Sequence, residues 1–332
     1  MVKIKFILTA YLFFSFSFFQ LNAQTPKKLK TIIVDAGHGG TDGGAHGGYE
    51  DGLNSYEKNV TLAISLKLVD ELKKQLPGVN VIPTRTTDIY QSPKEKAEIA
   101  NDNKGDLFIC IHADAAALKT GSRVIGHKMV TVYDSKVEWV KKGKKKVKKV
   151  VRIPREVEKP IIEYFKEPTK RSGTSIWLFA AHKTNDKLKA IMGNEEIQFE
   201  TQNDSTTNID FSTPENRMIA TAYAKRYQEK SIAIASLIND EIEKTDRAAL
   251  GINQRQVGIW VLQATRMPAI LVETGFITNY DDERYLNSAK GQQEIAECIT
   301  RAVIKYKKTL ENPIQDEVKA AETVTPVTST PK

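Results

Sequence analysis

The spacing of apolar and polar positions predicts a chain that folds as an α/β domain. Short apolar runs at residues 30–35, 79–83 and 107–111 are typical of buried strands. Between them, the apolar positions of residues 56–77 fall largely on one helical face, and residues 93–103 indicate a second helix with proline at its start. Strands that alternate with helices favour a mostly parallel sheet with helices on both faces.

The second half of the chain continues the pattern after an interruption. The same periodicities predict strands at residues 173–179, 258–262 and 269–272, and helices at about 185–191, 215–244 and 291–306.

The interruption is a long insertion at about residues 126–171. Its middle, residues 141–155, holds nine basic side chains: Lys141, Lys142, Lys144, Lys145, Lys146, Lys148, Lys149, Arg152 and Arg155. A charge run of this kind usually forms a solvated loop or face, and the alternative is contact with anionic wall or membrane groups. We also expect the polar stretch at about 197–214 to be mobile and the tail at 311–332 to be disordered.

The N-terminal residues 1–23 have the layout of a cleavable signal peptide. Lys3 and Lys5 precede an apolar run at 6–19, which is too short to span a bilayer, and small Ala23 suits a signal peptidase. No second long apolar segment follows. We therefore expect an exported protein, periplasmic or associated with the cell envelope, with a catalytic domain at 24–310 and no stable membrane span.

Charge and cysteine content exclude several classes. The formal net charge of +8 falls to +6 when Lys3 and Lys5 leave, and no recognition helix or base-stacking aromatic group accompanies it, so nucleic-acid binding is not expected. Cys110 and Cys298 are the two cysteines, which excludes a multi-cysteine zinc site. We interpret both as buried small side chains, with a single disulfide as the alternative.

Two of the five histidines directly follow predicted strands. His38 and His112 stand at the carboxyl ends of two such strands, where open α/β sheets form their ligand crevice. Two histidines and one carboxylate are an established ligand set for catalytic zinc. Glu57 is the favoured third ligand because it begins a helix, and Glu50 and Asp51 in the preceding loop are the competitors.

Glu273 directly follows the predicted strand at 269–272. Beside a metal ion, this carboxylate could take a proton from water and pass it to a leaving nitrogen. The alternative is an ion pair or a cap at the strand end.

Four segments carry a resemblance to a known family: VDAGHGG at 34–40, EKNVTL at 57–62, IHADA at 111–115 and PAILVETGF at 268–276. Together they resemble the zinc-dependent N-acetylmuramoyl-L-alanine amidases, the group that includes the AmiC-like cell-division amidases. The resemblance runs from about residue 30 to 306, and four motifs in the same order are highly specific.

The resemblance implies a single three-layer α/β domain with a mostly parallel six-stranded sheet and Zn²⁺ at the strand ends. It assigns the zinc ligands to His38, Glu57 and His112, and the catalytic carboxylate to Glu273. It implies that a zinc-activated water hydrolyses the amide bond between N-acetylmuramic acid and L-alanine of peptidoglycan, in wall remodelling or daughter-cell separation. Three further residues match a family segment that we expect to shape the loop beside the site: Thr84, Arg85 and Asp88.

Several positions depart from the family pattern. Ala36 stands where proline is usual, Cys110 where serine is common and Asp114 where asparagine is common. None of these removes a ligand, and Asp114 adds a negative charge near the metal. In division-associated members a helical insert can cover the site until a partner displaces it, so the insertion predicts autoinhibition relieved by an activator protein.

Two other functions compete with an amidase. A zinc carboxypeptidase or deacetylase acting on wall material would use the same metal ligands. A non-catalytic wall-binding module would keep the fold alone, which the presence of all four side chains argues against.

Overall fold

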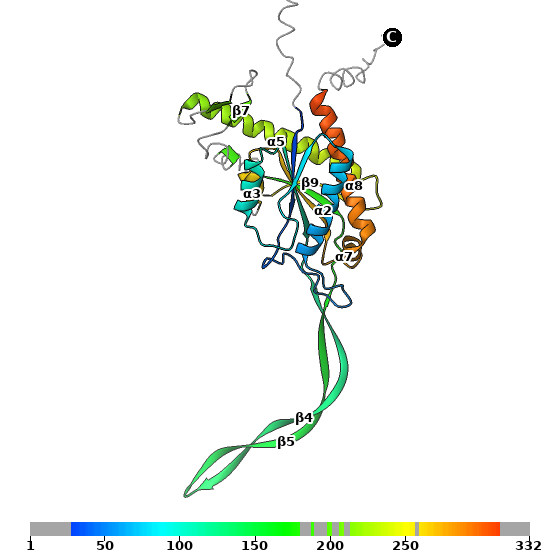
Figure 1. Cartoon of the computed structure of the whole chain (residues 1–332). Helices are drawn as coiled ribbons and strands as arrows, with labels where there is room; N and C mark the ends of the chain where they lie inside the picture. Colours follow the sequence, from blue (N-terminus) through cyan, green and yellow to red (C-terminus); the bar gives the residue numbers. More distant parts are fainter. Residues whose placement is uncertain are drawn as a thin grey trace, which may run out of the picture.

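The computed structural model contains a six-stranded sheet at its centre (Figure 1). It describes residues 28–179, 187–188, 198–200, 206–208, 213–255 and 259–312. The strand order is β2-β1-β3-β10-β6-β9, and the pair β6 and β9 runs antiparallel to the other four strands. Their bounds are β1 Thr31–Ala36, β2 Asn80–Pro83, β3 Leu107–Asp114, β6 Thr174–Phe179, β9 Ala249–Arg255 and β10 Ala269–Phe276. The predicted six-stranded, mostly parallel sheet is confirmed.

Two apolar clusters cover the two faces of this sheet. Alternate residues of a strand point to opposite faces, so Ile32 and Val34 join one cluster while Ile33 joins the other. The first cluster contains helices α2 Glu57–Gln75, α5 Pro214–Ile242 and α8 Ala289–Glu311. The second contains α3 Pro93–Asp102 and α6 Trp260–Ala264. The predicted arrangement of three layers is therefore confirmed.

The helix boundaries agree with the sequence where a cap marks them. Ser92 and Glu95 form a capping box at the start of α3, with Pro93 in its first turn. Helix α7, Tyr280–Asn287, was not predicted because its eight residues are mostly polar. Within the described ranges, no helix has the length and apolar character of a membrane span.

The prediction of a strand at 258–262 is wrong. Its described part leads into helix α6, and the sixth strand is β9, Ala249–Arg255. A short apolar run fits a buried helix as well as a strand, so periodicity could not separate the two. Strand β9 lies at the sheet edge, has no fully buried residue and contains Gly251 with a positive φ of 78°.

The basic insertion is a long β-hairpin and not a loop. Strands β4 Lys119–Lys142 and β5 Lys145–Glu167 pair with each other along their whole length, so the hairpin begins before the predicted boundary at 126. The hairpin projects away from the domain (Figure 1). Its side chains are largely exposed, as predicted, but the helical insert that the resemblance implied is absent from the described segment 119–167.

Some predictions lie wholly or mostly outside the described residues. They include the signal peptide at 1–23, the tail from 313 onward and most of the helix at 185–191, of which Lys187 and Leu188 are helical. Within the stretch at 197–214, the short strands β7 Gln198–Glu200 and β8 Thr206–Asn208 pair with each other.

The buried carboxylate of Glu241 joins helices α5 and α8. It accepts hydrogen bonds from Lys244 at 2.6 Å, from Arg301 at 2.7 Å and from Lys305. Burial alone would raise the pKa of Glu241, but these three cations lower it to about 2. Cys298 is a free thiol beside this cluster and Cys110 is a free thiol in β3, so the alternative of a disulfide is wrong.

We predict that Glu241→Gln lowers the free energy of unfolding by about 1–2 kcal/mol at neutral pH. The folded-state pKa of Glu241 lies below the ordinary value of 4.5, so its stabilisation is complete above pH 4.5 and is lost as the pH falls toward 2. Urea unfolding at several pH values measures the difference. The exposed Glu243→Gln is the control, and a difference that does not shrink below pH 4.5 would contradict the assignment.

Candidate metal centre

The four predicted site residues lie at one edge of the sheet, where β1, β3 and β10 end. His38 follows β1, His112 lies near the end of β3, and Glu57 is the first residue of α2. Glu273 in β10 is the register partner of His112 in β3. The parallel pairing of these strands therefore brings together side chains that are far apart in the sequence.

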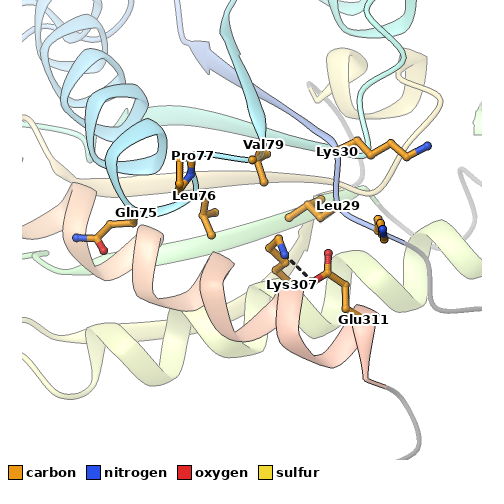
Figure 2. Close-up of a pocket in the computed structure, with 10 residues that line it drawn as sticks. Leu29, Lys30, Gln75, Leu76, Pro77, Val79, Lys307 and Glu311 are labelled. Atoms are coloured by element: carbon orange, nitrogen blue, oxygen red, sulfur yellow. Dashed lines mark hydrogen bonds and ion pairs between the residues drawn. The ribbon is translucent and has the colours of Figure 1, made fainter.

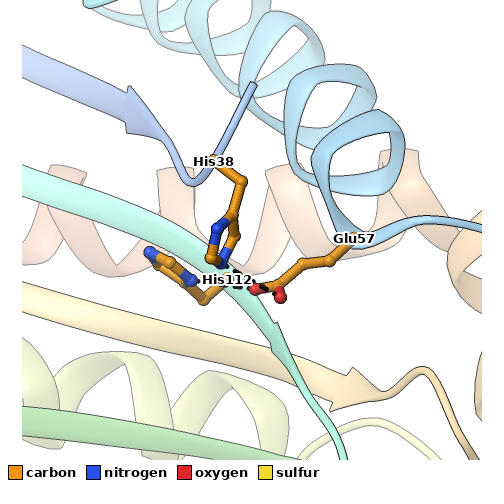
Figure 3. A group of neighbouring side chains, drawn as sticks. All are labelled: His38, Glu57 and His112. Carbon is orange, nitrogen blue, oxygen red and sulfur yellow. Dashed lines mark hydrogen bonds and ion pairs between the residues drawn. The ribbon is translucent and has the colours of Figure 1, made fainter. Parts of the chain in front are cut away.

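Three of these side chains form a compact cluster (Figure 3). Oε2 of Glu57 lies 3.1 Å from Nε2 of His38, and Oε1 of Glu57 lies 2.8 Å from Nδ1 of His112. One ligand atom from each residue lies within 4.8 Å of the other two, and within the described ranges this is the one such group of three. Glu50 pairs instead with Arg123 at 2.7 Å, and Asp51 is exposed, so neither competitor joins the cluster.

The donor set fits a divalent metal ion of the zinc type. Bonds of about 2.0–2.1 Å in a tetrahedron place ligand atoms roughly 3.3 Å apart, and the ligand atoms of the three side chains lie within 4.8 Å of one another, so small side-chain adjustments would bring them to one ion. The side chains of His38 and His112 are 24% and 20% exposed, so one side of the cluster is open to solvent. An open side is a requirement of a catalytic site.

Two glycines provide the space for this cluster. A Cβ on Gly37 would lie 2.6 Å from Nε2 of His112, and a Cβ on Gly44 would lie 2.6 Å from Oε2 of Glu57. Gly44 also has a positive φ of 65°, which side chains other than glycine rarely adopt. The glycine-rich loop after β1 therefore lets the backbone approach the ligands closely.

The electrostatics of the cluster favour a bound cation. Burial would lower the pKa of His38, but hydrogen bonds and charge from Glu57 and Asp42 raise it to about 9. Burial would raise the pKa of Glu57, but His112 and His38 hold it well below its usual range. A buried carboxylate that keeps its charge needs positive partners, which protons on the imidazoles or a metal ion can supply.

Asp42 is a supporting residue that the sequence analysis missed. Its Oδ2 lies 2.8 Å from Nδ1 of His38, the ring nitrogen that faces away from Glu57. A carboxylate on the far nitrogen of a metal-binding histidine fixes the orientation of its ring. The sequence feature that could have indicated this role is an acidic residue four positions after His38 in the same glycine-rich loop.

The expected loop-shaping role of residues 84–88 is confirmed. Arg85 donates hydrogen bonds to the carbonyls of Ala36 and Gly37 at 3.2 and 2.9 Å. Asp88 accepts from the backbone N–H of Gly40 at 2.7 Å and pairs with Lys58. These contacts hold the backbone on both sides of His38.

A buried ion pair lies beneath the strand ends and was also missed. Lys96 Nζ lies 3.1 Å from Oδ1 of Asp35 and donates a hydrogen bond to the carbonyl of Ala36 at 2.6 Å. Thr84 and Cys110 donate to the two oxygens of the same carboxylate. Cys110 therefore acts as a hydrogen-bond donor here, and not merely as a small apolar side chain.

Glu273 is a buried carboxyl at the edge of the cluster. It is 5% exposed, and its Oε2 has no hydrogen-bond partner among the described residues. Burial, helped by the negative charges of Glu57 and Asp114, raises the pKa of Glu273 to about 7. The guanidinium of Arg255, which the sequence analysis did not consider, lies 3.8 Å from Oε1 of Glu273 and over the ring of Trp177. A carboxyl with this pKa can both take and return a proton near neutral pH.

A hollow at the other end of the sheet carries none of these groups (Figure 2). Residues that precede β1 and β2 and residues at the end of α8 line it, including Leu29, Val79 and Lys307. Its lining contains no histidine, and it is remote from the carboxyl ends of the strands, so we do not assign the chemistry to it.

Comparisons with known proteins agree with this geometry. A family model described as N-acetylmuramoyl-L-alanine amidase matches residues 32–305. N-acetylmuramoyl-L-alanine amidase AmiA of Escherichia coli is 27% identical over 83% of this chain and 76% of its own length. The probable amidase AmiB of Haemophilus influenzae is 25% identical over 89% of this chain, which spans only 55% of that relative.

A solved structure shares the fold. Cwp6 from Clostridium difficile has a TM-score of 0.50 and 21% identity, over 83% of this chain and 29% of that one. Because the family model matches most of the chain, the chain belongs to the N-acetylmuramoyl-L-alanine amidase family.

Proposed function

We propose that this chain hydrolyses the amide bond between N-acetylmuramic acid and L-alanine in peptidoglycan stem peptides. The observation that carries the proposal is the cluster of His38, Glu57 and His112 beside buried Glu273, in a chain that belongs to this family. The three clustered side chains would hold Zn²⁺, and Glu273 would be the catalytic carboxylate.

The metal and the protein would have separate tasks. Zinc in such a site lowers the pKa of water and polarises a carbonyl. Glu273 would accept a proton from the attacking water and then deliver it to the nitrogen of L-alanine as the C–N bond breaks. Water is thus divided between the new carboxylate and the new amine, and no covalent enzyme intermediate is needed.

The setting of this reaction is the cell envelope. Peptidoglycan lies outside the cytoplasmic membrane, so the proposal includes export through the predicted signal peptide at 1–23. Wall remodelling and daughter-cell separation are the processes in which this activity would be used. An activator protein remains a prediction, and the helical insert on which it was based is not found in the hairpin segment.

The competing wall hydrolases would release different products. A carboxypeptidase would shorten the stem peptide and a deacetylase would release acetate, whereas an amidase releases intact stem peptides that begin with L-alanine. Mass spectrometry of digested wall fragments separates these outcomes. Shortened peptides or acetate as the main product would overturn the proposal.

We predict that Glu273→Gln lowers wall digestion by about 10²–10⁴-fold because the proton acceptor is lost. Zinc content should be unchanged, since Glu273 lies outside the group of three ligands. Release of soluble wall fragments and metal analysis give the two readouts. Exposed Glu243→Gln should keep both values, and substantial activity in Glu273→Gln would rule out its catalytic role.

We predict that His38→Ala loses zinc and activity together. Removal of one of three protein ligands should weaken zinc binding by more than about a hundredfold. Competition with a chromogenic zinc chelator measures the affinity. The matched control is His127→Ala, because His127 lies in the hairpin and outside the cluster. Equal zinc affinity in the two variants would refute the ligand assignment.

A third prediction concerns the space around the ligands. Gly44→Ala should weaken zinc binding because its Cβ would lie 2.6 Å from both Oε2 of Glu57 and the His38 ring. Gly143→Ala is a close control, since Gly143 has the same φ of 65° but no atom within 4 Å of the added Cβ. Both variants therefore carry the backbone strain of about 1 kcal/mol, and only the first should lose zinc affinity. The same chelator competition decides, and an equal loss in both would show that strain alone is responsible.

A further inference from the structure

The excess positive charge of the chain is concentrated at the far end of the hairpin. Residues 134–155, here called the distal arm, hold ten basic and two acidic side chains, a net charge of +8. The whole chain has 49 basic and 41 acidic residues, also a net +8, so the remainder is balanced. An exposed segment with this much positive charge attracts anionic partners.

The pairing of β4 with β5 separates the distal arm into two different faces. Residues that pair across the hairpin share a face, and alternate residues along each strand point to opposite faces. One face carries four basic and no acidic side chains, and we call it the cationic face: Ser135, Val137, Trp139 and Lys141 with Lys146, Lys148, Val150, Arg152 and Pro154, together with Tyr133, which pairs with Pro154 just outside the arm. The opposite face carries five basic side chains, Lys136, Lys142, Lys145, Lys149 and Arg155, but also both acids of the arm, Asp134 and Glu138.

Large apolar side chains stand among the cations of this face. Tyr133, Trp139 and Val150 are each 61% exposed, and Val137 is 53% exposed. Nζ of Lys148 lies 5.3 Å from the centre of the Trp139 ring. The run of lysines in the sequence contains no aromatic residue, and only the strand pairing places Trp139 beside it. A purely electrostatic contact gives no reason for such exposure of apolar groups.

We propose that the cationic face of the distal arm binds the surface of an anionic phospholipid membrane. Its lysines and Arg152 suit phosphate headgroups, and its Trp139 and Tyr133 suit the boundary between headgroups and acyl chains. A second copy of the same arm is disfavoured by repulsion between like charges. A two-stranded ribbon is also marginal in water, and a bound surface would support it.

The hairpin gives this contact a long reach. Strand β5 has 23 residues, which corresponds to about 70 Å at the rise of a β-strand. The hairpin leaves the domain just after β3, the strand that carries His112 (Figure 1). Membrane contact along the distal arm would leave the proximal half of the hairpin between the lipid and the domain, so the metal centre would lie tens of ångströms from the lipid.

The test uses the whole chain except the predicted signal peptide at 1–23. The protein is mixed with vesicles of equal parts phosphatidylglycerol and phosphatidylcholine, and the vesicles are then sedimented. We expect the protein to sediment with these vesicles and not with pure phosphatidylcholine vesicles. Duplex DNA and purified wall sacculi are the comparison ligands. Binding to either of them with no binding to the anionic vesicles would overturn the proposal.

Two matched variants test the face. Lys141→Gln, Lys146→Gln and Lys148→Gln together remove three charges from the cationic face. Lys142→Gln, Lys145→Gln and Lys149→Gln remove three from the opposite face of the same strands. We expect the first triple variant to lose about a hundredfold in vesicle affinity, at about 1 kcal/mol per lysine, and the second to lose much less. Equal losses would refute the assignment of the face.

Trp139 provides an independent readout that does not depend on loss of binding. Addition of anionic vesicles should shift the tryptophan emission of the protein to shorter wavelength, and Trp139→Phe should keep vesicle binding but lose the shift. A shift that persists in Trp139→Phe would overturn the placement of this face on lipid. Unchanged zinc content and circular dichroism in every variant verify that the domain is folded.

Discussion

The carboxylate of Glu57 is the contact on which the arrangement of the site depends. It lies near both imidazoles and also accepts hydrogen bonds from the backbone N–H groups of Ala45 and Ala113 at 2.8 and 3.0 Å. It thereby ties together the start of α2, the glycine-rich loop and the end of β3. A buried carboxylate without such partners would cost several kcal/mol, so its surroundings fix both its position and its charge.

A second layer of contacts holds the strand ends beneath this carboxylate. Lys96, which pairs with Asp35, donates a hydrogen bond to the carbonyl of Ala36, and Arg85 donates to the carbonyls of Ala36 and Gly37. These carbonyls belong to the backbone that turns from β1 into the loop of His38. The donors that hold this turn are charged, and hydrogen bonds from charged donors are stronger than those from neutral donors. These hydrogen bonds also restrict the backbone at Ala36.

The sequence predicts those parts of the structure that depend on the periodicity of apolar residues and on the position of polar residues at strand ends. Strands with both faces buried, such as β3 and β10, are near-continuous apolar runs, and polar residues at their ends can only be explained by a site or a cap. Thus His38, His112 and Glu273 could be singled out before the structure was known. Glu57 was a preference from helix geometry, because sequence alone does not say which carboxylate of the loop faces the histidines.

Other parts of the fold required information that is not local. Strand β9 lies at the sheet edge without a fully buried residue, and its apolar Leu250 and Ile252 are exposed, so its sequence does not mark a buried strand. The hairpin was missed because lysine-rich strands lack the apolar alternation that marks a half-buried strand, and the ladder between its two strands is set by pairing across the turn at Gly143. Asp42 was missed because its role depends on which nitrogen of His38 faces Glu57.

The base of the hairpin is tied to both loops that flank the metal cluster. Arg123 pairs with Glu50, and the N–H of Glu50 donates to the carbonyl of Lys166, which joins both strands to the loop between His38 and Glu57. On the other side, the backbone N–H of Thr169 donates to the carbonyl of Thr278, two residues beyond the strand of Glu273. Two separate attachments resist rotation of the hairpin about its base, whereas one would act as a hinge. The base of the hairpin is therefore fixed relative to the site, and a surface that holds the distal arm would also restrict how the site is presented.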